Sequence, residues 1–146
     1  AGTSRVMSSW PTSTGEAIHT STFLGNPVGC ALGIRSLELH AELNLEKRAR
    51  ELGTYLQDRF TELNLPGVRR VRGRGLMIGV ELEPLPDGSS RGVALMGAAL
   101  QRGVLVLPSG PGGHVISLTP PLVITKGQVD EAVAILAEEL RKVSQS

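Results

Sequence analysis

A cluster of hydroxyl side chains precedes a helix start near the N-terminus. Thr20, Ser21 and Thr22 are followed by Asn26-Pro27, which pairs a strong N-cap residue with a proline suited to the first helical position. Hydroxyls and backbone N–H groups ahead of a helix N-terminus can bind a phosphate or another anion. The same residue types also form ordinary turns and caps. The residues by themselves leave both interpretations open.

Other catalytic chemistry finds little support in the sequence. His19, His40 and His114 do not stand at metal-ligand spacing, and Cys30 is far from each of them, so no metal site is expected. No serine lies in a G-x-S-x-G motif, which argues against a hydrolase triad. The Gly-Arg-Gly at residues 73–75 is too short for a dinucleotide-binding loop. No residue is assigned a catalytic role.

Composition bounds the class of protein. The 146 residues, 40% hydrophobic and 20% charged, suit one soluble domain, or one domain with an appendage. The net charge of +1 gives no reason to expect nucleic acid or a membrane as partner. A single cysteine cannot form an internal disulfide, which favours a cytoplasmic location. No apolar run approaches the 18 residues or so of a transmembrane helix.

The predicted secondary structure alternates helices with pairs of strands. Residues 1–26, rich in Gly, Ser, Thr and Pro, are expected to form an extended arm. The spacing of apolar residues and the helix caps predict four helices. The first starts at Pro27 and breaks near Leu43-Asn44, the second carries an apolar stripe from Leu45 to Leu63, the third lies at 93–101, and the last starts with a capping box of Thr125 and Gln128. Alternating apolar residues and β-branched residues predict strands at 68–71, 76–82, 104–107 and 115–118.

This order predicts an α+β fold: a small, mainly antiparallel sheet with helices on one face, preceded by a long linking helix and an extended N-terminal arm. The expected division is an arm at 1–26, the remnant of a larger domain, and linking helices with a C-terminal small domain at 27–146. Three residues are expected to be buried or to fill the core, namely Cys30, Met77 and Met96. The charged residues at 46–51 are expected to be solvated.

Four motifs resemble those of class III pyridoxal-phosphate-dependent aminotransferases, of the aspartate-aminotransferase fold type. The first, at residues 19–27, reads His-Thr-Ser-Thr-Phe-Leu-Gly-Asn-Pro. The others stand at 71–81, 102–106 and 118–125, in the family's order and with family-like spacing. The resemblance covers nearly the whole chain and implies that it is the C-terminal portion of such an enzyme.

The resemblance implies particular functions for these residues. Ser21 and Thr22 resemble the pair that binds the phosphate of pyridoxal 5'-phosphate, reaching into the other subunit of a homodimer. The implied reaction moves an amino group between an amine or amino acid and a keto acid. A decarboxylase, aminomutase or racemase of the same fold stays open, as does a non-enzymatic α+β binding module.

Two departures from the family's pattern stand out. In the family, the lysine that forms the Schiff base with the cofactor belongs upstream of the segment that this chain resembles. The lysines present here, Lys47, Lys126 and Lys142, fall among helix-surface residues. The fragment itself is therefore expected to be inactive and not to retain the cofactor. Many relatives that act on α-amino acids carry an arginine for the substrate carboxylate where this chain has Ser117. Arg74 is another candidate for binding the substrate carboxylate, although a solvated or structural arginine is the simpler interpretation. The substrate-binding residues are left unassigned.

Overall fold

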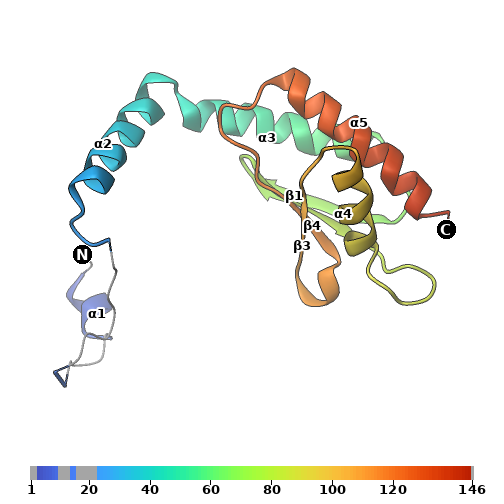
Figure 1. Ribbon diagram of the computed structural model, residues 1–146, viewed down its shortest axis with the longest axis horizontal. Helices are drawn as coiled ribbons and strands as arrows, with labels where there is room; N and C mark the ends of the chain where they lie inside the picture. The colour runs from blue at the N-terminus through green and yellow to red at the C-terminus, as the bar shows by residue number, and fades with distance from the viewer. Residues whose placement is uncertain (1–2, 10–13, 16–22, 146) are drawn as a thin grey trace. The chain divides into compact units, whose positions relative to one another are not determined.

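The computed structural model describes residues 3–9, 14–15 and 23–145 (Figure 1). The chain divides into two compact units, Ala1–Leu39 and His40–Ser146. The predicted order of helices and strands is confirmed, with two additions: the short helix α1 at Ser4–Met7 and the single-turn 3-10 helix η1 at Pro111–Gly113.

Helix α2 spans Pro27–Glu42 and begins where the sequence predicts. The Asn26 side-chain oxygen accepts a hydrogen bond from the backbone N–H of Gly29 at 3.0 Å, which is the expected N-cap interaction. None of the helix's side chains is buried. The prediction of a buried Cys30 is therefore wrong, because this cysteine is exposed. Burial requires a surface to pack against, and the size and polarity of a residue do not supply one.

Helix α3, at Leu45–Glu62, follows a break at the predicted place. Asn44 adopts a left-handed backbone with φ of 48° just before the helix, a conformation that asparagine tolerates better than most residues. The predicted apolar stripe faces the core, with Leu45, Leu56 and Phe60 buried. The side chain of Arg48 departs from the expected solvated face, and its contacts are described below.

The sheet has four strands in the order β1-β2-β4-β3, and every neighbouring pair is antiparallel. The strands are β1 (Val68–Arg74), β2 (Met77–Leu82), β3 (Leu107–Ser109) and β4 (Val115–Leu118). The small antiparallel sheet of the predicted α+β fold is thus confirmed. β1 continues three residues beyond its predicted end and pairs with β2 up to Arg74 and Met77.

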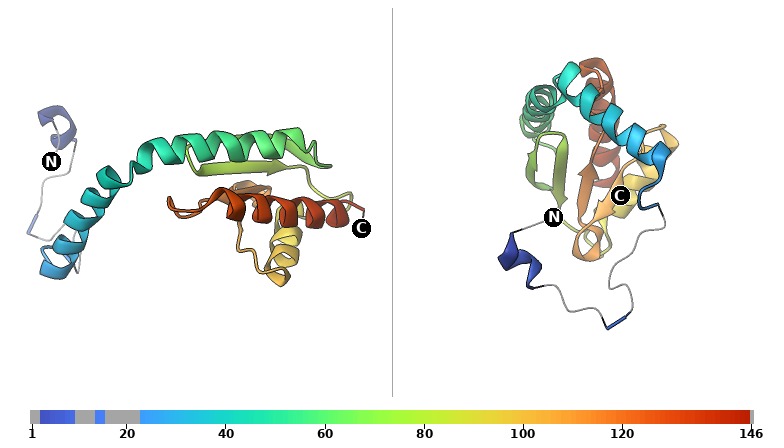
Figure 2. Two further views of the ribbon diagram at one scale, coloured as in Figure 1. Left: turned by 90° about the horizontal axis from the view of Figure 1, so that it is seen from above. Right: turned by 90° about the vertical axis from the view of Figure 1, so that its left-hand side faces the viewer.

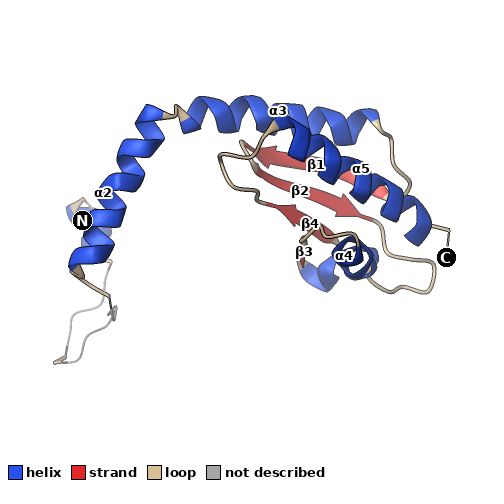
Figure 3. Ribbon diagram, turned by 45° about the horizontal axis from the view of Figure 1, so that its top comes forward, coloured by secondary structure: helices blue, strands red, loops and turns tan. Residues whose placement is uncertain are grey.

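Three helices cover one face of this sheet. Figure 3 shows α4 (Arg91–Gln101) and α5 (Lys126–Val143) in front of the strands, and Figure 2 shows α3 running beside the β1–β2 hairpin. Alternate residues of β2 and β4 point into this layer and are almost fully buried: Ile78, Val80, Leu82, Ile116 and Leu118. They pack against α5 residues such as Val129, Val133 and Leu140. Within the described part of the unit His40–Ser146, no helix covers the opposite face of the sheet.

Two details of the sheet differ from the sequence prediction. β3 lies at Leu107–Ser109 rather than at 104–107, because only the later residues pair with β4. Val106 is nevertheless buried, so its apolar character reflects packing against the core rather than strand pairing. Met77 is 66% exposed and does not fill the core, because it lies on the helix-free face. Met96 packs against the core as predicted.

The start of α5 is fixed from two sides. The predicted capping box is present: the Thr125 hydroxyl accepts from the Gln128 backbone N–H at 3.3 Å, and the Gln128 side chain accepts from the Thr125 N–H at 2.9 Å. The Arg48 guanidinium of α3 donates to the three carbonyls before the cap, those of residues 122, 123 and 124, at 3.1, 3.3 and 2.5 Å. The expectation of a solvated Arg48 is thus wrong.

Among the described residues, no helix combines the length and the apolar composition that crossing a membrane requires.

Candidate functional site

The predicted phosphate-binding residues Ser21 and Thr22 lie outside the described residues, as does His19. The described chain resumes at a turn, in which the Asn26 N–H donates to the Phe23 carbonyl at 3.1 Å. The N–H groups of Asn26 and Gly29 are therefore engaged in starting α2. Residues 20–22 stay the predicted source of hydroxyl and amide donors for a phosphate.

The three lysines of the chain all lie on α3 or α5. Lys47 faces Glu51 at 3.7 Å, and both side chains are 66% exposed. The Lys126 ammonium lies 4.4 Å from the centre of the Tyr55 ring and makes a cation–π contact with it. A lysine that reacts as a nucleophile has to lose its proton, which usually requires a desolvated pocket or a neighbouring cation. Neither surrounds these two lysines.

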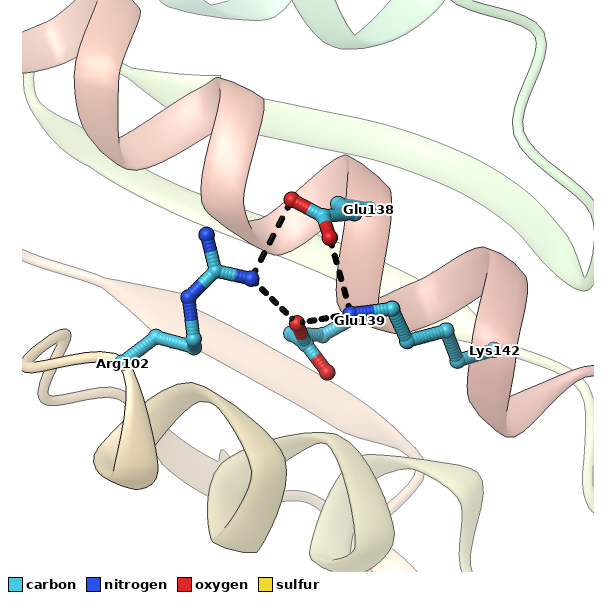
Figure 4. Close-up of polar contacts among 4 residues, drawn as sticks. All are labelled: Arg102, Glu138, Glu139 and Lys142. Carbon is cyan, nitrogen blue, oxygen red and sulfur yellow. Dashed lines mark hydrogen bonds and ion pairs between the residues drawn. The ribbon is translucent and has the colours of Figure 1, made fainter.

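Lys142 belongs to a cluster of four charged residues between α4 and α5 (Figure 4). Its ammonium lies 2.8 Å from a carboxylate oxygen of Glu138 and 2.8 Å from one of Glu139. Arg102 contacts the same two carboxylates at 3.1 and 2.7 Å. Hydrogen bonds to Glu138 and Glu139 raise the pKa of Lys142, which keeps the amine protonated. The cluster balances two acids with two bases and joins the helices, and it is not a nucleophilic site.

The helix-free face of the sheet gathers a different set of side chains. The strand register places Arg72 of β1 opposite Gly79 of β2, and Gly79 opposite Ser117 of β4. Because alternate residues share a face, Arg74 and Met77 lie on the same side as this row. The face therefore runs from a basic edge strand to a serine near the opposite edge.

A hollow of about 320 Å³ lies on this face, and it is called the open-face hollow here. Its lining includes Arg72, Arg74, Gly79, Ser109 and Ser117. The hydroxyls of Ser109 and Ser117 are 2.7 Å apart and form a hydrogen bond. The structure thus places Ser117 and Arg74, the two residues that the sequence raised for substrate carboxylate binding, on the same hollow. Ser109 was missed, because its contribution depends on the actual position of β3.

A second hollow, of about 570 Å³, lies beside β3 and α5. Its lining is almost wholly apolar and includes Phe60, Leu105, Pro121 and Ile124. Ser117 and Thr119 border both hollows, so the two meet near the end of β4. The second hollow has no titratable side chain in its lining, whereas the open-face hollow has cations and hydroxyls suited to an anion.

The described residues of the unit His40–Ser146 thus form an α+β fold whose open sheet face carries guanidinium and hydroxyl groups. Comparison with known proteins gives the family: the sequence profile described as aminotransferase class-III matches residues 1–140. The chain belongs to the class III aminotransferases. The resemblance noted from its four motifs is thereby confirmed.

Individual relatives support the same family assignment. The chain is 45% identical over 114 residues to an ornithine aminotransferase of Exiguobacterium sp., covering 78% of this chain and 26% of that protein. An acetylornithine aminotransferase of Methanothermobacter thermautotrophicus is 42% identical over 120 residues, which cover 81% of this chain and 29% of that protein. The solved acetylornithine aminotransferase of Elizabethkingia anophelis superposes with a TM-score of 0.75 at 32% identity, over 87% of this chain and 33% of that one. The chain thus spans under a third of the two curated relatives' length.

Proposed function

We propose that this chain is the C-terminal portion of a pyridoxal-phosphate-dependent aminotransferase, which moves an amino group between an amine or amino acid and a keto acid. The observation that carries the proposal is the class III family match across residues 1–140. We further propose that the whole enzyme is a cytoplasmic homodimer and that residues 1–26 belong to its large domain. The linking helices and small domain then occupy 27–146.

In this proposal Ser21 and Thr22 hold the cofactor phosphate for the partner subunit's site. Hydroxyl and amide donors suit a phosphate dianion, because hydrogen bonds to a charged acceptor are the stronger kind. Helix α2 follows directly, and the partial positive charge of its N-terminus adds to the attraction. The bound cofactor supplies the electron sink that amino-group transfer requires.

The chain by itself is proposed to be inactive and not to retain the cofactor. Lys47 and Lys142 are paired with carboxylates, and Lys126 lies against an aromatic ring. The raised pKa of Lys142 works against the neutral amine that attack on an aldehyde requires. None of the three has the surroundings of a covalent anchor for pyridoxal phosphate.

The serine at position 117 has a consequence for how the substrate's carboxylate is bound. A serine hydroxyl cannot make the bidentate, charged contact with a carboxylate that an arginine makes. The proposal is that the enzyme does not bind its substrate's carboxylate through the residue at position 117. The donor is then an amine without a carboxylate there, or an amino acid whose carboxylate other groups bind.

The test uses the whole protein encoded by the reading frame that contains this chain. Purified with pyridoxal phosphate, it is incubated with panels of amines and amino acids and with 2-oxoglutarate or pyruvate, and new amino acid is measured. Transamination with at least one pair is expected. Carbon dioxide release without consumption of keto acid would instead support a decarboxylase, and racemised or rearranged amino acid would support those alternatives.

Two variants and the isolated chain test the assigned parts. In the whole protein, Ser21→Ala with Thr22→Val should weaken cofactor retention during dialysis. Thr3→Val, which removes a hydroxyl at an exposed position elsewhere in the arm, should not. The 146-residue chain alone, treated with pyridoxal phosphate and borohydride, should show no stoichiometric adduct on one lysine by peptide mass spectrometry. Such an adduct would contradict the proposed inactivity of the isolated chain but would not affect its assignment to the class III aminotransferases.

A further inference from the structure

The loop between β2 and α4 carries Asp87-Gly88, the only Asp-Gly or Asn-Gly pair in the sequence. Both residues are exposed. Gly88 has φ of 83°, which favours glycine, and nothing in the described chain lies within 4 Å of a Cβ built on it, its two chain neighbours aside. Because Gly88 has no side chain, its backbone nitrogen is open to attack the carboxyl carbon of the preceding aspartate.

The ends of this loop are fixed to the rest of the domain. The Arg91 guanidinium donates to the carbonyls of Glu83 and Pro84, at 3.0 and 3.4 Å. The Ser90 hydroxyl donates to the Gly113 carbonyl at 2.8 Å. The tip of the loop, residues 85–89, therefore can change its backbone conformation while the end of β2 and the start of α4 keep their positions.

The tip is held in one conformation by hydrogen bonds of its own. The Asp87 carboxylate accepts from the Ser89 backbone N–H at 2.9 Å and from the Ser89 hydroxyl at 2.7 Å. The Gly88 N–H donates to the Leu85 carbonyl at 2.8 Å. The hydrogen bonds from Ser89 also hold the pKa of the Asp87 carboxyl below its usual value, which keeps it ionised. The carboxylate and the nitrogen beside it are thus engaged with different partners.

The chemistry available to this pair is cyclisation followed by hydrolysis. The Gly88 nitrogen bonds to the side-chain carboxyl carbon of Asp87 in its neutral, acid form. The nitrogen gives up its hydrogen and the carboxyl group gives up its hydroxyl, and the two leave as one water molecule. Water then opens the resulting succinimide ring at either of its two carbonyls. One opening restores aspartate, and the other leaves isoaspartate, in which the main chain runs through the former side-chain carboxyl.

We propose that Asp87-Gly88 is a site of spontaneous isoaspartate formation, and that the hydrogen bonds from Ser89 to the Asp87 carboxylate restrain this reaction in the folded chain. The reaction proceeds when the tip opens, because the Gly88 nitrogen then leaves the Leu85 carbonyl and can meet the carboxyl carbon. Isoaspartate adds one carbon to the main chain, so the original hydrogen bonds of the tip cannot re-form in the same geometry. The proposal is independent of the aminotransferase activity.

The experiment follows isoaspartate in the full chain during several weeks at neutral pH. Enzymatic methylation by an isoaspartyl methyltransferase measures its amount. Digestion with a protease that cleaves before aspartate but not before isoaspartate, followed by mass spectrometry, locates it. A synthetic peptide of residues 83–91 gives the rate without the fold. The folded chain should form isoaspartate at Asp87, at least about tenfold more slowly than the peptide, because charge-assisted hydrogen bonds hold the carboxylate.

The decisive variant is Ser89→Ala, which removes the hydroxyl but keeps the backbone N–H. It should form isoaspartate about threefold faster than the unaltered chain, since one hydrogen bond to the carboxylate is lost. Thr61→Ala, which removes an exposed hydroxyl of α3, should leave the rate unchanged. Asp87→Glu should abolish the signal at this position, because the same attack would require a larger ring. In urea that unfolds the chain, the unaltered chain and Ser89→Ala should react equally fast.

Two sets of results would overturn the proposal. Isoaspartate that forms at Asp58 or Asp130 but not at Asp87, or that forms nowhere in the chain, would remove the site. A folded chain that reacts as fast as the peptide, or equal rates for Ser89→Ala and the unaltered chain in native buffer, would remove the restraint. A difference between those two chains that persists in urea would assign the effect to local sequence and not to the folded loop.

Discussion

Gly53 of α3 lies directly against the carbonyl group of Gly75, in the turn between β1 and β2. A Cβ built on Gly53 would stand 2.0 Å from that oxygen and 2.3 Å from its carbon. The obstacle is backbone, and it cannot move aside as a flexible side chain can. Gly75 itself has φ of +55°, a left-handed conformation that favours glycine, so the turn that meets the helix is fixed in shape.

The first prediction concerns this contact. Gly53→Ala should lower the free energy of unfolding by about 3 kcal/mol, because the helix must move away from the β1–β2 turn and the core beneath it loosens. Urea denaturation followed by circular dichroism measures the change. Gly97→Ala in α4 is the matched control, since no atom lies within 4 Å of its added Cβ. That control should be stabilising by about 0.5–1 kcal/mol, and equal effects of the two changes would contradict the structure.

The second prediction concerns the guanidinium that holds the segment before α5. Arg48→Ala should destabilise the chain by about 2 kcal/mol, because the carbonyls of residues 122–124 lose a charged donor. Amide exchange in the first turn of α5 should quicken in the same variant. Lys47→Ala, at the preceding position, removes a side chain that faces exposed Glu51 and should change stability by less than about 0.5 kcal/mol. A larger effect for Lys47 than for Arg48 would count against the contact.

The third prediction concerns the capping box of α5. Thr125→Ala should cost about 1 kcal/mol, because the Gln128 N–H loses its acceptor at the helix N-terminus. Thr125→Ser keeps the oxygen and should retain most of the stability. If serine and alanine lower the denaturation midpoint equally, the hydroxyl does not act as a cap.

The fourth prediction concerns acid stability. Hydrogen bonds with Lys142, and then Arg102, lower the pKa of both Glu138 and Glu139 below the usual value of 4.5. A group whose pKa is lower in the folded state contributes stability that is present above its unfolded pKa and is lost as the pH falls through the folded pKa. Stability should therefore decline as the pH drops below about 4.5.

Thermal unfolding between pH 3 and pH 7 measures this decline. Glu138→Gln with Glu139→Gln should flatten the dependence in the acid range, because the two carboxylates can no longer take up protons on unfolding. Arg102→Gln, which keeps both acids and removes one cation, should flatten it in part. An unchanged slope in the double variant would show that other groups govern acid stability.

Features of this protein that depend on near neighbours along the chain could be predicted from its residues. Asn26 and Thr125 start their helices as expected, and β2 buries alternate residues, because caps and pleating act over a few residues. The family motifs likewise follow from sequence alone. Ser21 and Thr22, the predicted cofactor-phosphate residues, lie outside the described residues and stay a prediction.

Tertiary structure decided what depends on partners distant in sequence. Arg48 looks like any exposed helix cation until the segment before α5 passes beside it, and Met77 is exposed because helices cover only one face of the sheet. Ser109 joins Ser117 only because β3 lies at Leu107–Ser109 and not at the predicted 104–107. Local residue preferences carry no information about which surfaces meet, and the open-face hollow exists only where four strands align their residues in one register.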